Sequence, residues 1–512
     1  MQQNASKTGK NFIGVAIMIF LSKLLGFARD VLLAFFYGVG KLNDVYTSVF
    51  GISSLLFTSI GTAISSVIIP DLTYYLDKCS REERYRYIYS LLAQVTMLAA
   101  LISVLGIIGA PALSYLLMGS EWTEQMQGIA TTLIRIMMPT LLFVSLTYLA
   151  MGILQVHGRF ILSSAVSVPF NLLVIITLLL NRNDIILLGV VTALGWLLQF
   201  IIQLPVLIRE GYHPFRHIDF KNPHTVALFK RLVPILLGNS LIQLSLIIDR
   251  SFGLRIGESS ASMLYFGGTL FITITSIFIV AISTVVFPRL SRYSLAQNYA
   301  GIRRMLSYAF RILLFILLPY ILLVVAYHQD ILSLIYQHGN FPSEATLPTA
   351  KIFLIYSFAV PGYVCQELFN RVFYSLKNFK IPMVVSSACL LLNLGANCLL
   401  YETFGLIAIA GSTVLIMWLY AITMGFLIQR KVGGFIRRDY LQFLVELLLP
   451  LAALLIVMGL APLVFSPWGE FTFIFPTMIG GGLYLFVAWK TGLNKIFMIN
   501  DDDDDDDWEE LF

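Results

Sequence analysis

The chain has 512 residues, of which 58% are hydrophobic and only 12% are charged, and its mean hydropathy is +0.82. Soluble domains carry roughly a quarter charged residues, so this composition excludes a soluble globular protein and indicates a polytopic membrane protein. The formal net charge of +5 then reflects the placement of basic residues in loops, and we expect no nucleic acid as a partner.

Motif searches exclude several other classes. The four cysteines, Cys79, Cys365, Cys389 and Cys398, lack metal-ligand spacing, so neither a disulfide framework nor a zinc site is expected. No P-loop and no Ser/His/Asp cluster stands out, which predicts that the chain is not an enzyme and is not driven directly by ATP. The first apolar segment has no small-residue cleavage site after it, so we expect a retained helix rather than a signal peptide.

Apolar stretches separated by charged or Gly/Pro-containing loops predict fourteen membrane-spanning helices, since a helix needs roughly 20 apolar residues to cross a bilayer. The expected spans lie near residues 11–37, 43–70, 88–118, 127–155, 159–181, 184–208, 226–254, 259–288, 304–327, 346–376, 381–401, 405–429, 440–465 and 471–490. An even number of crossings puts both termini on one side of the membrane.

The basic residues indicate which side that is. The termini and the loops after even-numbered spans hold 24 of the 34 Lys and Arg residues. The opposite loops hold Lys41, Arg182, Arg255 and Lys351. Because cytoplasmic loops are enriched in Lys and Arg, both termini are predicted to be cytoplasmic.

An internal repeat predicts how the spans are grouped. The segment AISSVIIPDL at residues 63–72 recurs as AISTVVFPRL at residues 281–290. A weaker echo relates Asn171-Leu172 in the fifth span to Asn393-Leu394 in the eleventh. Six spans separate the copies, so both share one orientation and predict two parallel six-helix lobes around a central path, which is the plan of an alternating-access transporter.

This interpretation divides the chain into four parts. We expect an N-terminal lobe over residues 1–222, a C-terminal lobe over 223–436 and two further spans over 437–495. Residues 496–512 contain a run of seven aspartates, Asp501–Asp507, and are predicted to form a solvated cytoplasmic tail.

Ionisable residues inside predicted spans are candidate functional groups, because charge is costly in the bilayer. Lys23, Arg29 and Asp30 lie in the first span. Two cations six residues apart are about two helical turns apart and suit successive phosphates of a lipid headgroup, with Arg29 able to make bidentate contacts. The alternative is that Arg29 pairs with Asp30 or Asp44 while Lys23 extends to the interface.

A second group lies in the C-terminal half. Asp249 and Arg250 in the seventh span either pair with each other or act separately. Asn393 and Asn397 share a face of the eleventh span, and Thr413 lies in the twelfth. One carboxylate with several neutral oxygens suits a monovalent hard cation, and the alternative is that these polar side chains only join helices by hydrogen bonds.

Several motifs resemble one family. These are LLGFARD at residues 24–30, GVG at 38–40 with Asn43-Asp44, AISTVVFPRLSR at 281–292, RVFYSLKNFKIP at 371–382, and PFN at 169–171. They resemble the MurJ/MviN family, the lipid II flippases of the multidrug/oligosaccharidyl-lipid/polysaccharide exporter superfamily. The likeness covers residues 11–490.

The resemblance implies an all-α bacterial inner-membrane protein of fourteen helices with a central cationic cavity. It would move undecaprenyl-pyrophosphate-linked peptidoglycan precursor from the cytoplasmic to the outer leaflet, driven by membrane potential or a sodium gradient. The family's substrate-binding residues map onto Lys23, Arg29, Asp30 and Asp44. Its sodium site maps onto Asp249, Asn393, Asn397 and Thr413, with Na⁺ as the candidate coupling ion and no other cofactor expected.

This chain departs from the family at three of these positions. Phe57 and Thr269 stand where some or most members carry arginine, and Asn397 stands where the sodium site has a second acid. Fewer fixed cations would hold a pyrophosphate less firmly, which leaves open a flippase for another polyprenyl-linked oligosaccharide, such as a capsule unit. A cation-coupled drug antiporter and a non-transporting scaffold are further alternatives, and the cations Lys23 and Arg29 argue against the antiporter. We expect a monomer, because the chain encloses its own path.

Overall fold

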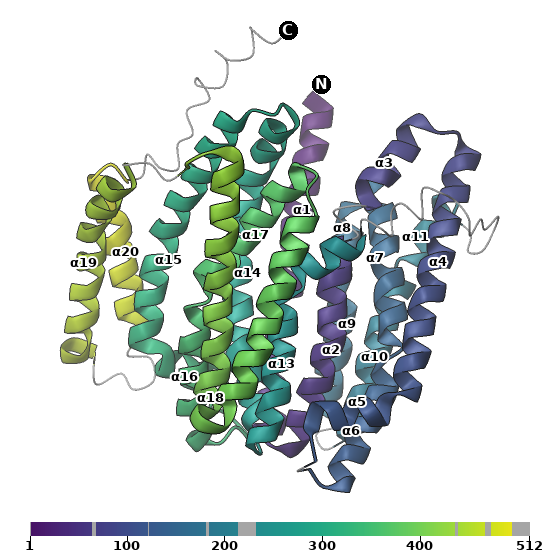
Figure 1. The fold of residues 1–512 in the computed structure, drawn as a ribbon, viewed down its shortest axis with the longest axis horizontal. Coiled ribbons are helices and arrows are strands. Elements are labelled where there is room, and N and C mark those ends of the chain that lie inside the picture. The colour runs from purple at the N-terminus through teal and green to yellow at the C-terminus, as the bar shows by residue number, and fades with distance from the viewer. Residues whose placement is uncertain are drawn as a thin grey trace.

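The computed structural model describes residues 2–63, 68–120, 122–180, 184–212, 232–435, 439–465 and 473–493. Within these ranges the regular structure is helical, with no strand, and the helices form an elongated bundle (Figure 1). Nine described helices are long and apolar enough to cross a membrane, or ten if the bent pair Leu232–Asn239 and Leu241–Ile256 is one span. The expectation of an all-α polytopic membrane protein is therefore confirmed, and the count of fourteen stays a prediction.

Eleven helices make up the described part of the N-terminal half. They are α1 (Gln2–Tyr37), α2 (Lys41–Ala63), α3 (Ile69–Lys78), α4 (Arg81–Ile108), α5 (Ala110–Met118), α6 (Glu124–Met137), α7 (Thr140–Val156), α8 (Phe160–Ser164), α9 (Ser167–Leu180), α10 (Ile185–Ile201) and α11 (Leu204–Arg209). Proline accounts for several joins, because it lacks an N–H and cannot continue a helix. Pro111 lies at the start of α5 and Pro139 lies between α6 and α7.

The C-terminal half continues from the bent segment 232–239. Its helices are α13 (Leu241–Ile256), α14 (Ser260–Leu295), α15 (Tyr299–Tyr336), α16 (Ser343–Ser357), α17 (Val360–Ser375), α18 (Lys380–Val432), α19 (Asp439–Phe465) and α20 (Ile474–Lys490). The chain of α18 turns at Gly405, whose φ of 58° favours glycine. Asn393 donates a hydrogen bond to Ser412 at 3.3 Å, although a straight helix would place them roughly 28 Å apart. The two arms of α18 therefore lie against each other.

Apolar packing connects these helices into a single bundle. One buried cluster is formed within the C-terminal half. Another combines Leu33 and Val45 of the N-terminal half with Tyr265, Tyr336 and Phe353 of the C-terminal half. The last two helices, α19 and α20, lie beside α15 at the left of Figure 1, where the Tyr484 hydroxyl donates to the Phe315 carbonyl at 2.6 Å. The predicted divisions at residues 222 and 436, residues 64–67 of the decapeptide repeat, and the tail 496–512 lie outside the described residues.

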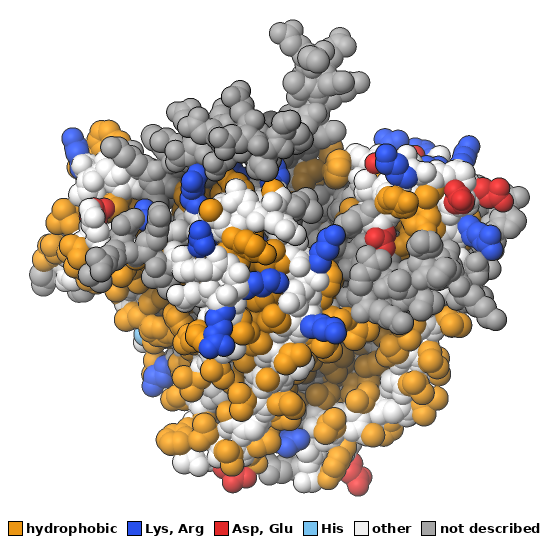
Figure 2. Space-filling model, turned by 45° about the horizontal axis from the view of Figure 1, so that its top comes forward, with side chains coloured by type: hydrophobic (Ala, Val, Ile, Leu, Met, Phe, Trp, Pro, Cys, Tyr) orange, Lys and Arg blue, Asp and Glu red, His pale blue; other side chains and the backbone are white. Residues whose placement is uncertain are grey.

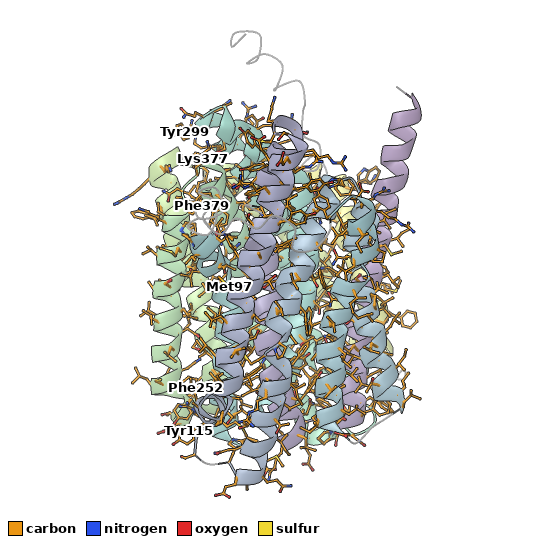
Figure 3. The ribbon with its side chains drawn as sticks, turned by 90° about the vertical axis from the view of Figure 1, so that its right-hand side faces the viewer. Met97, Tyr115, Phe252, Tyr299, Lys377 and Phe379 are labelled. Atoms are coloured by element: carbon orange, nitrogen blue, oxygen red, sulfur yellow. The ribbon has the colours of Figure 1, made fainter. Side chains whose placement is uncertain are left out.

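The surface of the bundle is divided between charged and apolar regions. Figure 2 shows Lys and Arg side chains gathered over the end that comes forward, with hydrophobic side chains on the flank below it. In Figure 3, Tyr299 and Lys377 lie at one end, Tyr115 lies toward the other, and Met97 lies on the flank between them. Met97 is 60% exposed, as an apolar side chain facing lipid would be.

Close contact between α17 and α18 depends on a glycine. A Cβ atom at Gly362 would lie 2.9 Å from the carbonyl carbon of Met417, whereas one at Gly395 would meet nothing within 4 Å. We expect Gly362→Ala to destabilise the fold by about 1–3 kcal/mol, because backbone must shift to make room. Gly395→Ala is the matched control and should be neutral or stabilising. Thermal unfolding of the two purified variants in detergent measures the difference, and equal melting temperatures would contradict this account of the packing.

Candidate functional site

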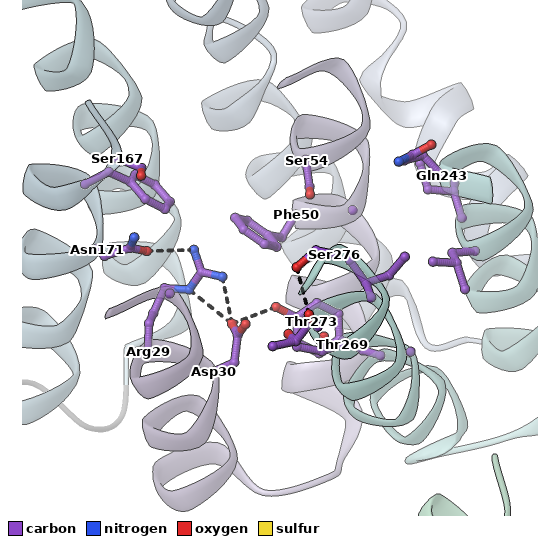
Figure 4. Close-up of a pocket in the computed structure, with 18 of the residues that line it drawn as sticks. Arg29, Asp30, Phe50, Ser54, Ser167, Asn171, Gln243, Thr269, Thr273 and Ser276 are labelled. Atoms are coloured by element: carbon purple, nitrogen blue, oxygen red, sulfur yellow. Dashed lines mark hydrogen bonds and ion pairs between the residues drawn. The ribbon is translucent and has the colours of Figure 1, made fainter. Parts of the chain in front are cut away.

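A cavity of about 410 Å³ lies between the two halves of the bundle (Figure 4). Helices α1, α2, α9 and α10 line it from the N-terminal half, and α13, α14 and α17 line it from the C-terminal half. Its polar lining includes Arg29, Asp30, Asn171, Gln243, Arg250 and Ser276. The sequence predicts two of these, Arg29 and Asp30, as substrate-binding residues.

Arg29 and Asp30 form an ion pair in the cavity wall. Arg29 donates from Nη2 and Nε to Asp30 Oδ1 at 2.8 and 3.1 Å, and from Nη1 to Asn171 Oδ1 at 3.2 Å. The Tyr265 hydroxyl donates to the same Asp30 oxygen at 2.9 Å, and the Arg29 guanidinium lies 5.0 Å from the ring centre of Phe50. The pairing considered as the alternative therefore forms, and Arg29 still faces the cavity.

Lys23 also approaches the cavity. Its Nζ donates to the Ser276 Oγ at 2.6 Å, which connects α1 to α14. Ser276 lines the cavity, so the ammonium is held beside it by a neutral partner. Among the described residues no carboxylate pairs with Lys23, and its positive charge is not neutralised locally.

Asp44 lies apart from the cavity lining and connects the two halves. Its Oδ2 accepts from the Ser259 backbone N–H at 2.6 Å, and its Oδ1 accepts from the Ser262 N–H and Oγ at 2.7 and 2.6 Å. A carboxylate at a helix N-terminus satisfies unpaired N–H groups and complements the helix dipole. Nearby, Lys41 forms an exposed salt bridge to Glu258 at 2.6 Å. The structure thus brings Arg29 and Asp30 together in the cavity wall, places Lys23 beside the cavity through Ser276, and shows Asp44 capping α14.

The four predicted cation-site residues do come together, all with 0% exposure. Asp249 on α13 accepts hydrogen bonds from Thr413 Oγ1 at 2.8 Å, Tyr356 at 2.8 Å and Asn397 Nδ2 at 2.9 Å. Asn393 Nδ2 donates to Thr413 Oγ1 at 3.2 Å. The fold of α18 at Gly405 makes this possible, since it brings both arms against α13.

The oxygen atoms of this cluster suit a small hard cation. Ser412 donates to the Asn397 side-chain oxygen. The buried Oδ1 of Asn393 accepts no hydrogen bond from any described residue, which is uncommon for a buried amide oxygen. One carboxylate with amide and hydroxyl oxygens is a ligand set for such an ion.

The sequence singles out Arg250 but predicts no place for it in the cavity. Of the two alternatives, a pair with Asp249 or separate roles, the structure shows the second, because Asp249 faces α18 while Arg250 lines the cavity. The Arg250 guanidinium lies 4.9 Å from the ring centre of Tyr265. Successive helical residues point about 100° apart, so the separation could have been found from helix geometry. Nothing in the sequence marked Tyr265 and Tyr356 as site residues, because aromatic residues are common throughout the spans.

The capping role of Asp44 can be tested by stability. Asp44→Ala leaves the backbone N–H groups of Ser259 and Ser262 without this acceptor, whereas the Ser262 hydroxyl keeps the Ser259 carbonyl at 3.1 Å, so we expect a loss of about 2–3 kcal/mol in the free energy of unfolding. Glu258→Gln, which removes only the exposed salt bridge, should cost under about 1 kcal/mol. Denaturation of the purified variants in detergent compares them, and an Asp44→Ala protein as stable as Glu258→Gln would argue against the cap.

Two helical halves that share a charged cavity within an apolar bundle define a membrane transporter. Residues 33–479 match the family model described as lipid II flippase MurJ, and the chain belongs to that family. It is 27% identical over 506 residues to the probable lipid II flippase MurJ of Buchnera aphidicola subsp. Acyrthosiphon pisum, covering 96% of each chain. It is 25% identical over 406 residues to the lipid II flippase MurJ of Burkholderia cenocepacia, covering 77% of this chain and 78% of the relative.

Solved structures support the same fold. The structure of lipid II flippase MurJ in an inward closed conformation aligns with a TM-score of 0.77 at 23% identity, over 93% of this chain and 98% of that one. A multidrug resistance MATE family transporter of the MOP superfamily, in an inward-facing conformation, aligns with a TM-score of 0.63 at 14% identity, over 83% and 98%.

Proposed function

We propose that this chain moves lipid II from the cytoplasmic to the outer leaflet of the bacterial cytoplasmic membrane by alternating access. The observation that carries this proposal is the charged cavity shared by the two halves, in a member of the MurJ family. Lys23 and Arg29 provide cations for the pyrophosphate of a lipid-linked glycan. The substrate is the only partner proposed, and the chain is taken to act as a monomer.

The proposed topology has fourteen crossings with both termini in the cytoplasm. Support comes from α18, whose turn at Gly405 divides it at the predicted join between the eleventh and twelfth spans. Further support comes from the pairs α6/α7 and α16/α17, each of which overlaps one predicted span with ends that differ by one to three residues. The placement of Lys and Arg in the sequence gives the orientation.

The outer gate of this transporter is proposed to lie where α2 and α14 begin. Asp44 joins the halves there through α14. Asn340 donates from its backbone and side-chain nitrogens to the Phe35 and Phe36 carbonyls at the end of α1, at 2.8 and 2.7 Å. Trp122 donates to the Leu254 carbonyl at 2.7 Å, which joins the halves again. These contacts must separate for the substrate to leave outward.

The cluster at Asp249 is proposed to bind Na⁺ as the coupling ion, alongside a contribution from membrane potential. Asp249 would supply the carboxylate, and Asn393, Asn397 and Thr413 would supply neutral oxygens. The unused Oδ1 of Asn393 supports this assignment, because a cation would satisfy it.

A second candidate substrate is another polyprenyl-linked oligosaccharide. Thr269, which lines the cavity, favours it, because a hydroxyl there offers no charge to a pyrophosphate. Growth tests in two hosts separate the candidates: one depleted of its lipid II flippase, and one lacking a capsule-unit flippase. Rescue of the capsule strain alone would favour the second substrate.

Complementation also tests the cavity. The intact chain should restore growth to a bacterium depleted of its lipid II flippase, and Arg29→Ala should not, because the cavity loses a phosphate-binding cation. Arg135→Ala, at an exposed cation on α6, is the control and should restore growth. Membrane levels of all three proteins are compared by immunoblot. Growth supported by a normally inserted Arg29→Ala protein would refute the assigned role of this residue.

Sodium binding is measured on the purified protein. Na⁺ should raise the melting temperature relative to choline at equal ionic strength, because a ligand that binds only the folded state stabilises it by mass action. Asp249→Ala should remove this shift, whereas Asp44→Asn, which alters a carboxylate elsewhere, should retain it. A shift that persists in Asp249→Ala would place the ion elsewhere.

A further inference from the structure

We infer that Arg250 is a specificity-determining residue of the cavity, whose positive charge distinguishes a lipid diphosphate from a lipid monophosphate. This inference rests on the proposed function. It assigns the recognition of the second phosphate to α13, in the C-terminal half, while Arg29 and Lys23 act from α1 in the N-terminal half.

The cations of the cavity differ in whether a carboxylate contacts them. Arg29 is paired with Asp30 at 2.8 Å, which offsets part of its charge, although its Nη1 still bonds only the neutral Asn171 in the cavity wall. Arg250 has no carboxylate partner among the described residues, and its buried Nε has no hydrogen-bond partner. To the described residues it makes one hydrogen bond, from Nη1 to the Thr47 carbonyl at 3.4 Å, although a guanidinium has five N–H donors. Arg250 therefore carries a charge and donors that are available to an anion in the cavity.

The neighbouring acid cannot neutralise it by contact. Asp249 is turned toward α18, where Thr413, Tyr356 and Asn397 all donate to its oxygens. In the part of the chain that the structure describes, no ion pair joins Asp249 to Arg250, so Asp249 and Asp30 attract the guanidinium only from a distance.

The contacts that hold the Arg250 guanidinium in place do not include a carboxylate. It lies 4.9 Å from the ring centre of Tyr265, and a cation over an aromatic face is attracted to it. On the other side is Gly51 of α2, where a Cβ atom would lie only 2.3 Å from Arg250 Nη1. Tyr265 also donates to Asp30, so a continuous set of contacts runs from Arg29 to Arg250 along the cavity wall. Two arginines fixed on opposite halves suit two linked phosphates, each of which an arginine can bind bidentately.

The direct test measures binding of farnesyl diphosphate and farnesyl monophosphate to the purified full-length chain. The wild-type protein should prefer the diphosphate, and Arg250→Gln should weaken diphosphate binding by roughly ten- to a hundredfold while changing monophosphate binding far less. Arg255→Gln is the matched control, since Arg255 lies on the same helix but donates to the Leu116 carbonyl outside the cavity lining. It should bind both probes as the wild type does.

Two further variants keep the test independent of folding defects at Arg250. Gly51→Ala leaves the charge in the chain but displaces the guanidinium, so it should also reduce the preference for diphosphate. Thr269→Arg, added to Arg250→Gln, returns a cation to the cavity lining and should recover part of the preference.

The outcomes separate this inference from the proposed function. If the wild type restores growth and prefers the diphosphate, but Arg250→Gln keeps the same preference, only the role of Arg250 is overturned. If the wild type neither restores growth nor prefers the diphosphate, both are overturned. Loss of preference in Arg250→Gln with retention in Arg255→Gln supports both.

Discussion

The cost of burying charge in an apolar bundle governs the interior of this protein. Two consecutive residues of α13 offset this cost in different ways. Asp249 accepts three hydrogen bonds from side chains of α16 and α18, whereas Arg250 lies over the ring of Tyr265 beside the cavity. An unpartnered carboxylate at this depth would be strongly destabilising, so the turn of α18 at Gly405 is needed to deliver its partners. The proposed cation cluster and the charged cavity therefore lie on two sides of one turn of α13.

That arrangement joins the two sites mechanically. Asp249 and Arg250 share a backbone, so α13 cannot move toward or away from α18 without changing the position of Arg250 in the cavity. The helix meets the segment 232–239 at a bend of 55°. Asn239 at this bend accepts hydrogen bonds from Tyr374 at 2.9 Å and Asn370 at 3.2 Å, which tie the bend to α17. A cation that draws the oxygens of α13 and α18 together would therefore also shift Arg250 in the cavity.

The sequence predicted the helical membrane fold because its apolar stretches are long and its loops are marked by charge, glycine and proline. It also predicted the grouping of Asp249 with Asn393, Asn397 and Thr413, although this rested on the family resemblance as well as on their depth. It did not predict that Asp44 caps α14, because a cap between residues 215 apart depends on how the halves dock. The place of Arg250 in the cavity could not be predicted for a related reason: adjacency to Asp249 left a pair and separate roles equally open, and only tertiary contacts show that the two side chains point apart.

The polar contacts between the two halves differ from those of Asp249 in whether water can replace them. The contacts of Asp44, Asn340 and Trp122 satisfy helix-end N–H and C=O groups, and water can replace each of them when the halves separate there. The net loss per hydrogen bond is then only about 0.5–1.5 kcal/mol, so a gate of this kind opens at moderate cost. The contacts of Asp249 all lie within the C-terminal half, so they need not break when the halves separate. Breaking them without a substitute ligand would cost considerably more. In such a bundle the contacts at the helix ends can break and re-form repeatedly while the contacts of the buried charged residues stay in place.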